Sequence, residues 1–313
     1  MKKLIILLIA NVLFFAGYVI GGPVEMSRIS SEANWLACVD CEQFIKSDVS
    51  KIIRTELAKQ GVEQKLSNFT KLFGFHPLDD VRNIMLYGQG HERENAVVLL
   101  EGKFDKAKLL ALVGLNPEYK EIKYDNITIQ QWLQKDSNSG QDSQAQIMYG
   151  CFYRDDMIIL GSGLPAVKNS IDVLNGSAAS ASNRIFTDTL LKNENAFFQI
   201  ATNSLEQIVG SDPKAVLLKQ AEQLVIIVGE DENSVFSAVN LKAKSQESAG
   251  YINQMLEGFI VFLTLADEEQ PALAKLAQMV KLSSVEDIIQ IRLELQPELI
   301  QQIISSNIDD IEE

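Results

Sequence analysis

Histidine is almost missing from this sequence, and cysteine is scarce. The 313 residues contain only His76 and His91 as histidines and Cys38, Cys41 and Cys151 as cysteines. Histidine is the most frequent general acid or base and the most frequent metal ligand, so two isolated copies exclude most histidine-based sites. Neither histidine has the paired spacing of zinc ligands. We therefore expect no catalytic residue, no cofactor and no bound metal.

Positive charge is also in short supply. The chain has 28 Lys and Arg against 42 Asp and Glu, a net charge of −14. Nucleic acids and anionic membrane surfaces select proteins with basic patches. We expect no nucleic-acid partner, and contact with a membrane only through the N-terminal segment. Proline is limited to 7 residues and apolar residues make up 46%, a composition that excludes disordered and collagen-like classes.

Long apolar runs are absent beyond the N-terminus. Two lysines follow Met1, and the uncharged stretch Leu4–Ile20 comes next. A basic start followed by an apolar run is typical of an export signal. The run is slightly shorter than the ~20 residues that span a bilayer as a helix, so an uncleaved anchor over residues 4–20 is the alternative. We expect residues 1–22 to direct the chain to the periplasm or the cell exterior.

Two halves of similar design follow this segment. At about 150 residues per domain, the length suggests two domains or one duplicated domain. A first half over 33–176 and a second over 195–306 share the order strand, helices, hairpin, helix, strand, helix, which indicates an internal repeat. Small and polar residues between them predict a linker over 177–194, and residues 307–313 form an acidic tail.

Alternating patterns predict antiparallel sheets. The clearest lies near the C-terminus, where Ile289, Ile291, Leu293 and Leu295 alternate with polar residues. A strand of this kind buries one face and exposes the other. We therefore expect an α+β fold in two similar halves, each an antiparallel sheet with helices packed on one face.

Helical spacing predicts the main helices. It favours helices over 42–60 and 165–174, and a long helical region over 246–282 that is interrupted near Pro271. The most apolar part of that region, 259–266, is too short to span a membrane. We expect it to be a buried portion of the helix.

A C-x-x-C motif is formed by Cys38 and Cys41 at a strand-to-helix junction. Disulfides persist in exported proteins, so this pair is a candidate disulfide, and a redox dithiol is a second interpretation. Asp40 lies between the thiols and would raise their pKa, which disfavours redox chemistry. The simplest alternative treats both as small buried apolar side chains.

A second local motif is Gly161–Ala166, which matches the G-x-G-x-x-A pattern of dinucleotide-binding loops. That pattern needs a parallel βαβ unit with an acidic residue about 20 residues further on, and the helix here ends in a Ser/Ala-rich stretch. Pro165 also removes an amide donor. We interpret the motif as a tight strand-to-helix turn.

The remaining candidates are turns or ends. His76–Asp80 combines a histidine with two carboxylates, but Pro77 makes a turn between a helix and a strand the simpler interpretation. His91 is expected in a polar hairpin loop, and the acidic tail is expected to be a solvated end.

Four stretches carry a resemblance to a known group of proteins. They read ANWLACVDCEQFIKSDV, FGFHPLDDVRNIMLYG, AVVLLEGKFD and MIILGSGLPAVKNSIDVLNG. Over nearly the whole chain after the N-terminal segment, the sequence resembles uncharacterised exported bacterial proteins built as two-part α+β repeats and classed as domains of unknown function. The resemblance implies this fold and export. It implies no activity, substrate or catalytic residue.

These observations favour a non-enzymatic protein of the cell envelope or periplasm that acts as a structural or interaction module, with another envelope protein as its partner. The alternative is a carrier or sensor of a small apolar ligand, held in a cavity between sheet and helices. A thiol-based enzyme using Cys38 and Cys41 is the third hypothesis.

Overall fold

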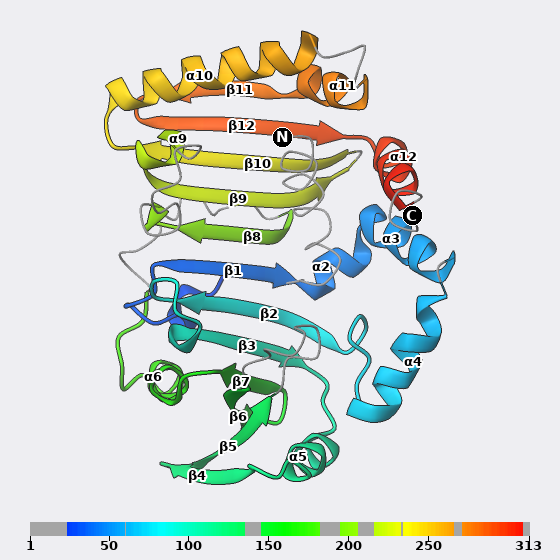
Figure 1. Cartoon of the computed structure of the whole chain (residues 1–313), viewed down its shortest axis with the longest axis vertical. Coiled ribbons are helices and arrows are strands. Elements are labelled where there is room, and N and C mark those ends of the chain that lie inside the picture. Colours follow the sequence, from blue (N-terminus) through cyan, green and yellow to red (C-terminus); the bar gives the residue numbers. More distant parts are fainter. Residues whose placement is uncertain are drawn as a thin grey trace. The chain divides into compact units, whose positions relative to one another are not determined.

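The computed structural model has the α+β class that the sequence predicts. It describes residues 24–59, 61–134, 145–181, 195–205, 216–232, 234–265 and 271–308. These fall into two compact units, one within Met1–Lys46 and Ile53–Ile185 and the other within Ser47–Ile52 and Phe186–Glu313. The N-terminal segment 1–22, most of the linker and the end of the acidic tail lie outside the described residues. The elements of each unit are labelled in Figure 1.

The first unit is built on seven antiparallel strands in the order β1-β2-β3-β7-β6-β5-β4. The β4–β5 turn has Asp125 at φ 48°, in the left-handed region typical of tight hairpins. The strands are β1 (Trp35–Asp40), β2 (Val81–Gly88), β3 (Ala96–Gly102), β4 (Lys120–Tyr124), β5 (Ile127–Gln134), β6 (Gln146–Arg154) and β7 (Met157–Gly161).

The helices of this unit begin where the sequence offers caps. The Asp105 carboxylate accepts the Lys108 N–H at 3.0 Å and caps α5, and Pro165 lies in the first turn of α6 as predicted. Helix α6 packs on β3, β6 and β7. The helical elements are η1 (Met26–Arg28), α2 (Cys41–Lys46), α3 (Asp48–Lys59, whose first turn belongs to the second unit), α4 (Val62–Phe73), η2 (Arg93–Asn95), α5 (Lys106–Gly114) and α6 (Leu164–Leu174).

The single helix predicted over 42–60 was wrong, because Ser47 divides it into α2 and α3. The Ser47 hydroxyl accepts the Ser50 N–H at 3.0 Å and so caps the first turn of α3. The Glu230 carboxylate also accepts the Asp48 N–H at 2.8 Å. Apolar periodicity continues through both helices, which is why the break is invisible in the hydrophobic pattern.

The second unit has five antiparallel strands in the order β8-β9-β10-β12-β11. Its strands are β8 (Ala196–Thr202), β9 (Ala221–Asp231), β10 (Ser234–Ala243), β11 (Lys281–Val285) and β12 (Ile288–Leu295), and its helices are α9 (Val216–Lys219), α10 (Gln246–Leu265), α11 (Pro271–Met279) and α12 (Pro297–Ile308). The predicted helical region 246–282 therefore ends too late, because residues 281–285 form the edge strand β11.

Helix α10 contributes its N-terminal half to the core of the second unit. Ala249 and Ile252 are buried in one cluster with Leu241, Ala243 and Ile289. Burying a side chain as large as that of Ile252 stabilises the fold by about 1.5–3 kcal/mol. The C-terminal half is different, because Phe259, Val261, Phe262 and Leu265 are exposed. The expectation that 259–266 is buried was wrong for the described part of that stretch.

The strand orders of the two units correspond. Strands β1, β2, β3, β7 and β6 of the first unit match β8, β9, β10, β12 and β11 of the second in chain order and in sheet order. In the first unit α5 lies between β3 and β6 in the chain, and α6 follows β7. In the second unit α10 and α11 lie between β10 and β11, and α12 follows β12. The first unit adds the hairpin β4–β5.

Candidate functional site

A cleft of about 260 Å³ opens on the first unit beside the N-terminus of α6. Its walls come from the segment after η1, the end of β2, the start of β3 and the first turns of α6. Both apolar and polar side chains line it, namely Ser30, Glu32, Ala33, Tyr87, Gly88, Gln89, Asn95, Val97, Pro165, Ala166 and Asn169.

The predicted glycine motif ends at one wall of this cleft, which its last two residues, Pro165 and Ala166, line. Gly163 precedes α6, and a Cβ added there would lie 2.0 Å from the carbonyl oxygen of Glu94. Its φ of −113° is accessible to any residue, so the requirement is close packing of two backbones. Strand β7, which leads into the motif, is antiparallel to both neighbours. Close packing of the backbone therefore explains the glycines of the motif, in agreement with the predicted tight strand-to-helix turn.

Two buried hydroxyl groups lie close together in the first unit, that of Tyr87 on the wall of the cleft and that of Ser170 on α6. Tyr87 is 3% exposed and Ser170 is fully buried, and neither hydroxyl makes a hydrogen bond of good geometry within the described structure, although the two are near enough to interact weakly. Burial raises the pKa of Tyr87 to about 12, an effect that the neighbouring Ser170 hydroxyl partly offsets, so the phenol stays neutral. A buried polar group without a partner is costly, and such groups need a structural or functional explanation.

No local sequence motif predicts that these polar side chains line one cleft. Tyr87 ends a strand, Asn95 follows a hairpin loop and Asn169 lies within a helix. They line one cleft only because β2, β3 and α6 pack together. The apolar character of β2 and α6 predicts burial, but it does not predict which polar group faces the cleft.

The C-x-x-C thiols lie in the core at the β1–α2 junction. Cys38 is 1% exposed and Cys41 is fully buried, and both are free thiols. Burial raises the pKa of both, and the neighbouring carboxylate of Asp40 raises that of Cys41 further. The Asp40 carboxylate accepts the Gln43 N–H at 2.6 Å and so caps the helix.

The Cys38–Cys41 disulfide is the alternative that the sequence leaves open, and the free thiols of the structure give a different expected result. We expect both thiols to react with a thiol reagent only after denaturation, because a buried, protonated thiol is a poor nucleophile. Titration of the protein as isolated from its own cell, with and without denaturant, measures this. Denatured protein in which only one of three cysteines reacts would indicate the disulfide.

The histidine-containing turn uses its carboxylates for structure. The Asp80 carboxylate accepts the His76 backbone N–H at 2.6 Å, and Asp79 pairs with Arg54 at 2.8 Å. No group of three or more candidate metal ligands occurs among the residues that the structure describes. His91 lies exposed in the β2–β3 loop, as expected.

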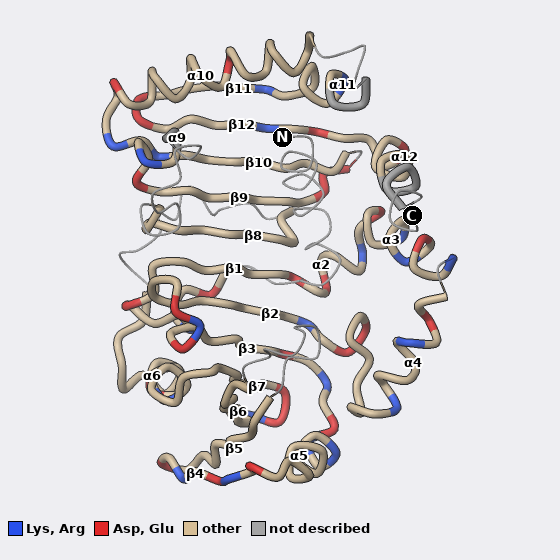
Figure 2. The backbone as a smooth tube through the Cα atoms, in the orientation of Figure 1, with Lys and Arg blue, Asp and Glu red and all other residues tan. Residues whose placement is uncertain are grey.

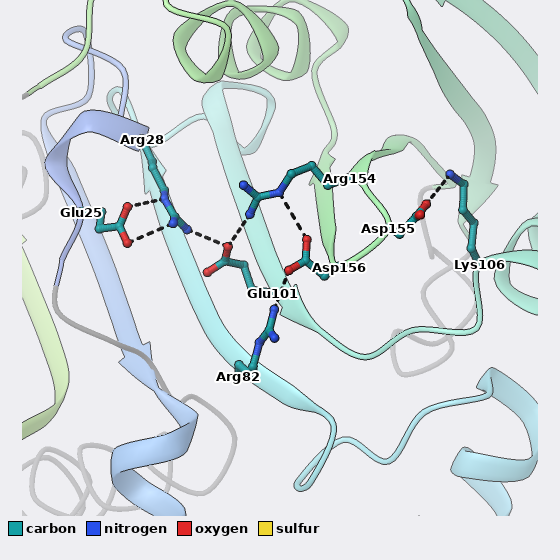
Figure 3. A network of polar contacts seen from close by, with 8 residues as sticks. All are labelled: Glu25, Arg28, Arg82, Glu101, Lys106, Arg154, Asp155 and Asp156. Carbon is teal, nitrogen blue, oxygen red and sulfur yellow. Dashed lines mark hydrogen bonds and ion pairs between the residues drawn. The ribbon is translucent and has the colours of Figure 1, made fainter.

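An ion-pair network crosses the first unit and is drawn in Figure 3. Glu101 is the inner member, with its side chain 14% exposed, and it receives Arg28 at 2.8 Å and Arg154 at 3.0 Å. Arg154 also reaches Asp156 at 3.3 Å, and Asp156 accepts Arg82 at 2.6 Å. The hydrogen bond from Arg82 lowers the pKa of Asp156. The pair of Arg28 with Glu101 ties η1 to strand β3. Because acidic and basic side chains alternate along the network, it leaves little net charge to attract a ligand.

Replacing Glu101 with glutamine is expected to lower the free energy of unfolding by about 1–2 kcal/mol, because two arginines lose the charge that holds them. The matched control is Asp155→Asn. Asp155 pairs with Lys106 at 3.0 Å, but its side chain is 93% exposed, so its loss is expected to cost under about 0.5 kcal/mol. Urea unfolding followed by tryptophan fluorescence measures both. Equal effects of the two variants would contradict this account of the network.

Comparisons with known proteins give only distant structural similarity. No family model matches the chain, and no curated protein matches it. Among solved structures, crystal form III of TP0453 matches with a TM-score of 0.47 at 10% identity, covering 90% of this chain and 97% of that chain. Crystal form I of TP0453 gives a TM-score of 0.44 at the same identity and coverage. Within the described residues, no helix is both long enough and apolar enough to cross a membrane.

Proposed function

We propose that this chain is an exported, non-enzymatic interaction protein of the cell envelope or periplasm. The observation that carries the proposal is the exposed apolar surface of α10. Six of its large apolar side chains are exposed, namely Tyr251, Met255, Phe259, Val261, Phe262 and Leu265. Contiguous apolar patches larger than a few hundred Å² are rare on soluble proteins and mark surfaces that bind other molecules.

The chemistry-bearing groups of the first unit support the same proposal. The C-x-x-C thiols are buried and protonated, Asp40 and Asp105 cap helices, and the carboxylates of the histidine turn are engaged locally. Each of these groups serves the fold, whereas the α10 surface contributes little to it. A binding function would use the exposed apolar surface of α10, which the fold itself does not need.

Export is tested by fractionating the cells that make the protein. We expect it in the envelope or periplasmic fraction, with a mass that lacks residues 1–22 if the signal is cleaved, or the full mass if residues 4–20 stay as an anchor. Full-length protein found only in the cytosol would contradict export. Turnover in an activity screen that disappears on one point mutation would contradict the non-enzymatic part of the proposal.

An internal duplication also belongs to this proposal. The shared order of five strands in both units supports it, because independent folds rarely repeat the same connections. If one ancestral unit was duplicated, the two copies have diverged in what they present. The first now carries the cleft and the ion-pair network, and the second carries the exposed helix. Superposition of the five shared strands in an experimental structure tests this inference.

The second candidate function is a carrier or sensor of a small ligand in the cleft. Its support is the buried Tyr87 hydroxyl, which lies on the cleft and makes no hydrogen bond of good geometry in the described structure. The mixed lining favours a ligand with an apolar body and a hydrogen-bonding group, rather than the purely apolar ligand expected from the sequence.

Replacing Tyr87 with phenylalanine tests this candidate. We expect the free energy of unfolding to stay unchanged or to rise by up to about 1 kcal/mol, because the variant removes a buried hydroxyl whose interaction with the Ser170 hydroxyl is weak. In the control Tyr124→Phe it is expected to fall by about 1 kcal/mol, because the Tyr124 hydroxyl donates to Asp172 at 2.8 Å. Native mass spectrometry is expected to show a small molecule on the original protein and none on Tyr87→Phe. Only unliganded protein in both would contradict the carrier function.

A further inference from the structure

Helix α10 presents an apolar seam with the spacing of a helix-pairing surface. Tyr251, Met255, Gly258, Phe262 and Leu265 recur at alternating intervals of four and three residues, and all are exposed. This is the spacing of the two contact positions in a heptad. The opposite face carries Ala249 and Ile252, which are buried in the core of the second unit. The helix therefore uses one face for its own fold and leaves a second apolar face uncovered by the described chain.

The seam is nearly symmetric about Gly258. Tyr251 and Leu265 lie seven residues on either side of it, and Met255 and Phe262 lie three and four residues away. A Cβ added to Gly258 would meet nothing within 4 Å, so neither the fold nor its neighbours require a glycine there. Glycine in the middle of a helix costs about 1 kcal/mol relative to alanine. What it provides is room for a second helix to approach the backbone closely.

We propose that the seam of α10 binds the same seam in a second copy of this chain, with the two helices antiparallel across a two-fold axis at Gly258. This inference rests on the proposed interaction function and names its partner. In such a pair, Tyr251 faces the partner's Leu265, Met255 faces the partner's Phe262, and Gly258 faces the partner's Gly258. Each large side chain meets an apolar one, as a two-fold symmetric interface requires.

The charges on α10 favour this partner over a lipid surface. The helix carries Glu247 and Glu257 and no lysine or arginine, and its tube in Figure 2 is otherwise tan. Helices that lie on membranes usually have basic residues on their polar face, and these are absent here. Aromatic residues and methionine without charge are typical of the centre of protein interfaces.

The exposed apolar area of α10 comes close to what a specific contact buries on each partner. Tyr251, Phe259 and Phe262 are 58%, 43% and 63% exposed. An aromatic side chain can bury about 150–250 Å², so these three offer about 100 Å² each, and with Met255, Val261 and Leu265 the face offers on the order of 500 Å². Specific interfaces bury about 600–1,000 Å² on each partner. When two such faces pair, the polar side chains around them are buried as well. The area buried on each partner then reaches the lower end of that range.

The decisive variant is Gly258→Leu in the full chain. A leucine at this position adds apolar surface and raises helix propensity, so it strengthens general hydrophobic attraction while it blocks close approach of two helices. We expect sedimentation of the original protein to show a dimer that dissociates on dilution, and Gly258→Leu and Phe262→Glu to weaken it at least tenfold. The control Leu115→Glu, at a 79% exposed leucine outside the seam, is expected to dimerise like the original.

Cross-linking adds a readout of geometry. The native cysteines are buried, so mild oxidation of Gly258→Cys is expected to give a covalent dimer, and oxidation of Leu115→Cys is expected to give little. The proposal is overturned if the full chain is monomeric throughout, or if its dimer survives both seam variants. Flotation with neutral vesicles that Phe262→Glu abolishes and Gly258→Leu preserves would also overturn it, in favour of a lipid surface. A monomer in which these variants lose a different protein partner would refute self-pairing and leave the proposed interaction function intact.

Discussion

Replacing Gly163 with alanine is expected to lower the free energy of unfolding by about 3 kcal/mol, because the added methyl group collides with backbone rather than with a side chain. The new Cβ would lie 2.0 Å from the Glu94 carbonyl oxygen and 2.9 Å from its carbonyl carbon. A flexible side chain could rotate away from such a contact. Here η2 or the start of α6 must move, and both form walls of the cleft.

The matched control for this prediction is Gly114→Ala. Gly114 ends α5, and a Cβ there would meet nothing within 4 Å. Alanine is the better helix former, so stability is expected to stay equal or to rise by up to about 1 kcal/mol. Both tryptophans, Trp35 and Trp132, lie in the first unit, so tryptophan fluorescence during urea unfolding reports on the unit that carries both glycines. If Gly163→Ala is tolerated as well as Gly114→Ala, the close approach of η2 and α6 is wrong.

The second large effect is expected in the other unit, where Phe236→Ala should lower the free energy of unfolding by about 3–5 kcal/mol. Phe236 is fully buried and pairs across the sheet with Gly229. Its ring occupies the space over that glycine, since a Cβ on Gly229 would lie 2.5 Å from the ring. The Arg292 guanidinium stacks 4.3 Å from the ring centroid, so the variant also removes a cation–π contact.

The matched control is Phe259→Ala on α10. This phenylalanine is 43% exposed, and in dilute solution its removal is expected to change stability by under about 1 kcal/mol. Circular dichroism during urea unfolding follows the strands and helices of both units, and comparison with tryptophan fluorescence separates the contribution of the second unit, which has no tryptophan. Similar losses for Phe236→Ala and Phe259→Ala would mean that the α10 surface belongs to the core, and it would remove the basis of the proposed function.

The sequence predicts the fold best where local chemistry and apolar pattern agree. Pro165 marks the start of α6, and the alternation of residues 289–295 marks a strand, and the structure confirms both. The sequence predicts a strand poorly where few of its side chains are apolar and buried. Strand β11 has one half-buried apolar residue, Leu282, among exposed ones, and it exists because it pairs with β12.

The candidate sites depend on contacts that the sequence does not contain. The glycine motif next to α6 is visible, but its reason is the Glu94 backbone, some 70 residues earlier in the chain. The apolar character of residues 259–265 is equally visible, and it predicts burial. An apolar helix face has the same sequence pattern whether it packs on the protein's own sheet or on a partner. The pattern alone therefore does not show which of the two covers the face.

The central claim is that the exposed face of α10 is covered by a partner in the cell. Met255, 52% exposed and in the middle of the seam, provides a direct probe, because an accessible methionine is readily oxidised to the sulfoxide. The measurement is oxidative footprinting of the full chain in intact cells, compared with the same protein purified and diluted, followed by mass spectrometry of the peptide that contains Met255. The account predicts that Met255 is protected in cells and oxidised after dilution. Equal and rapid oxidation in both would contradict it.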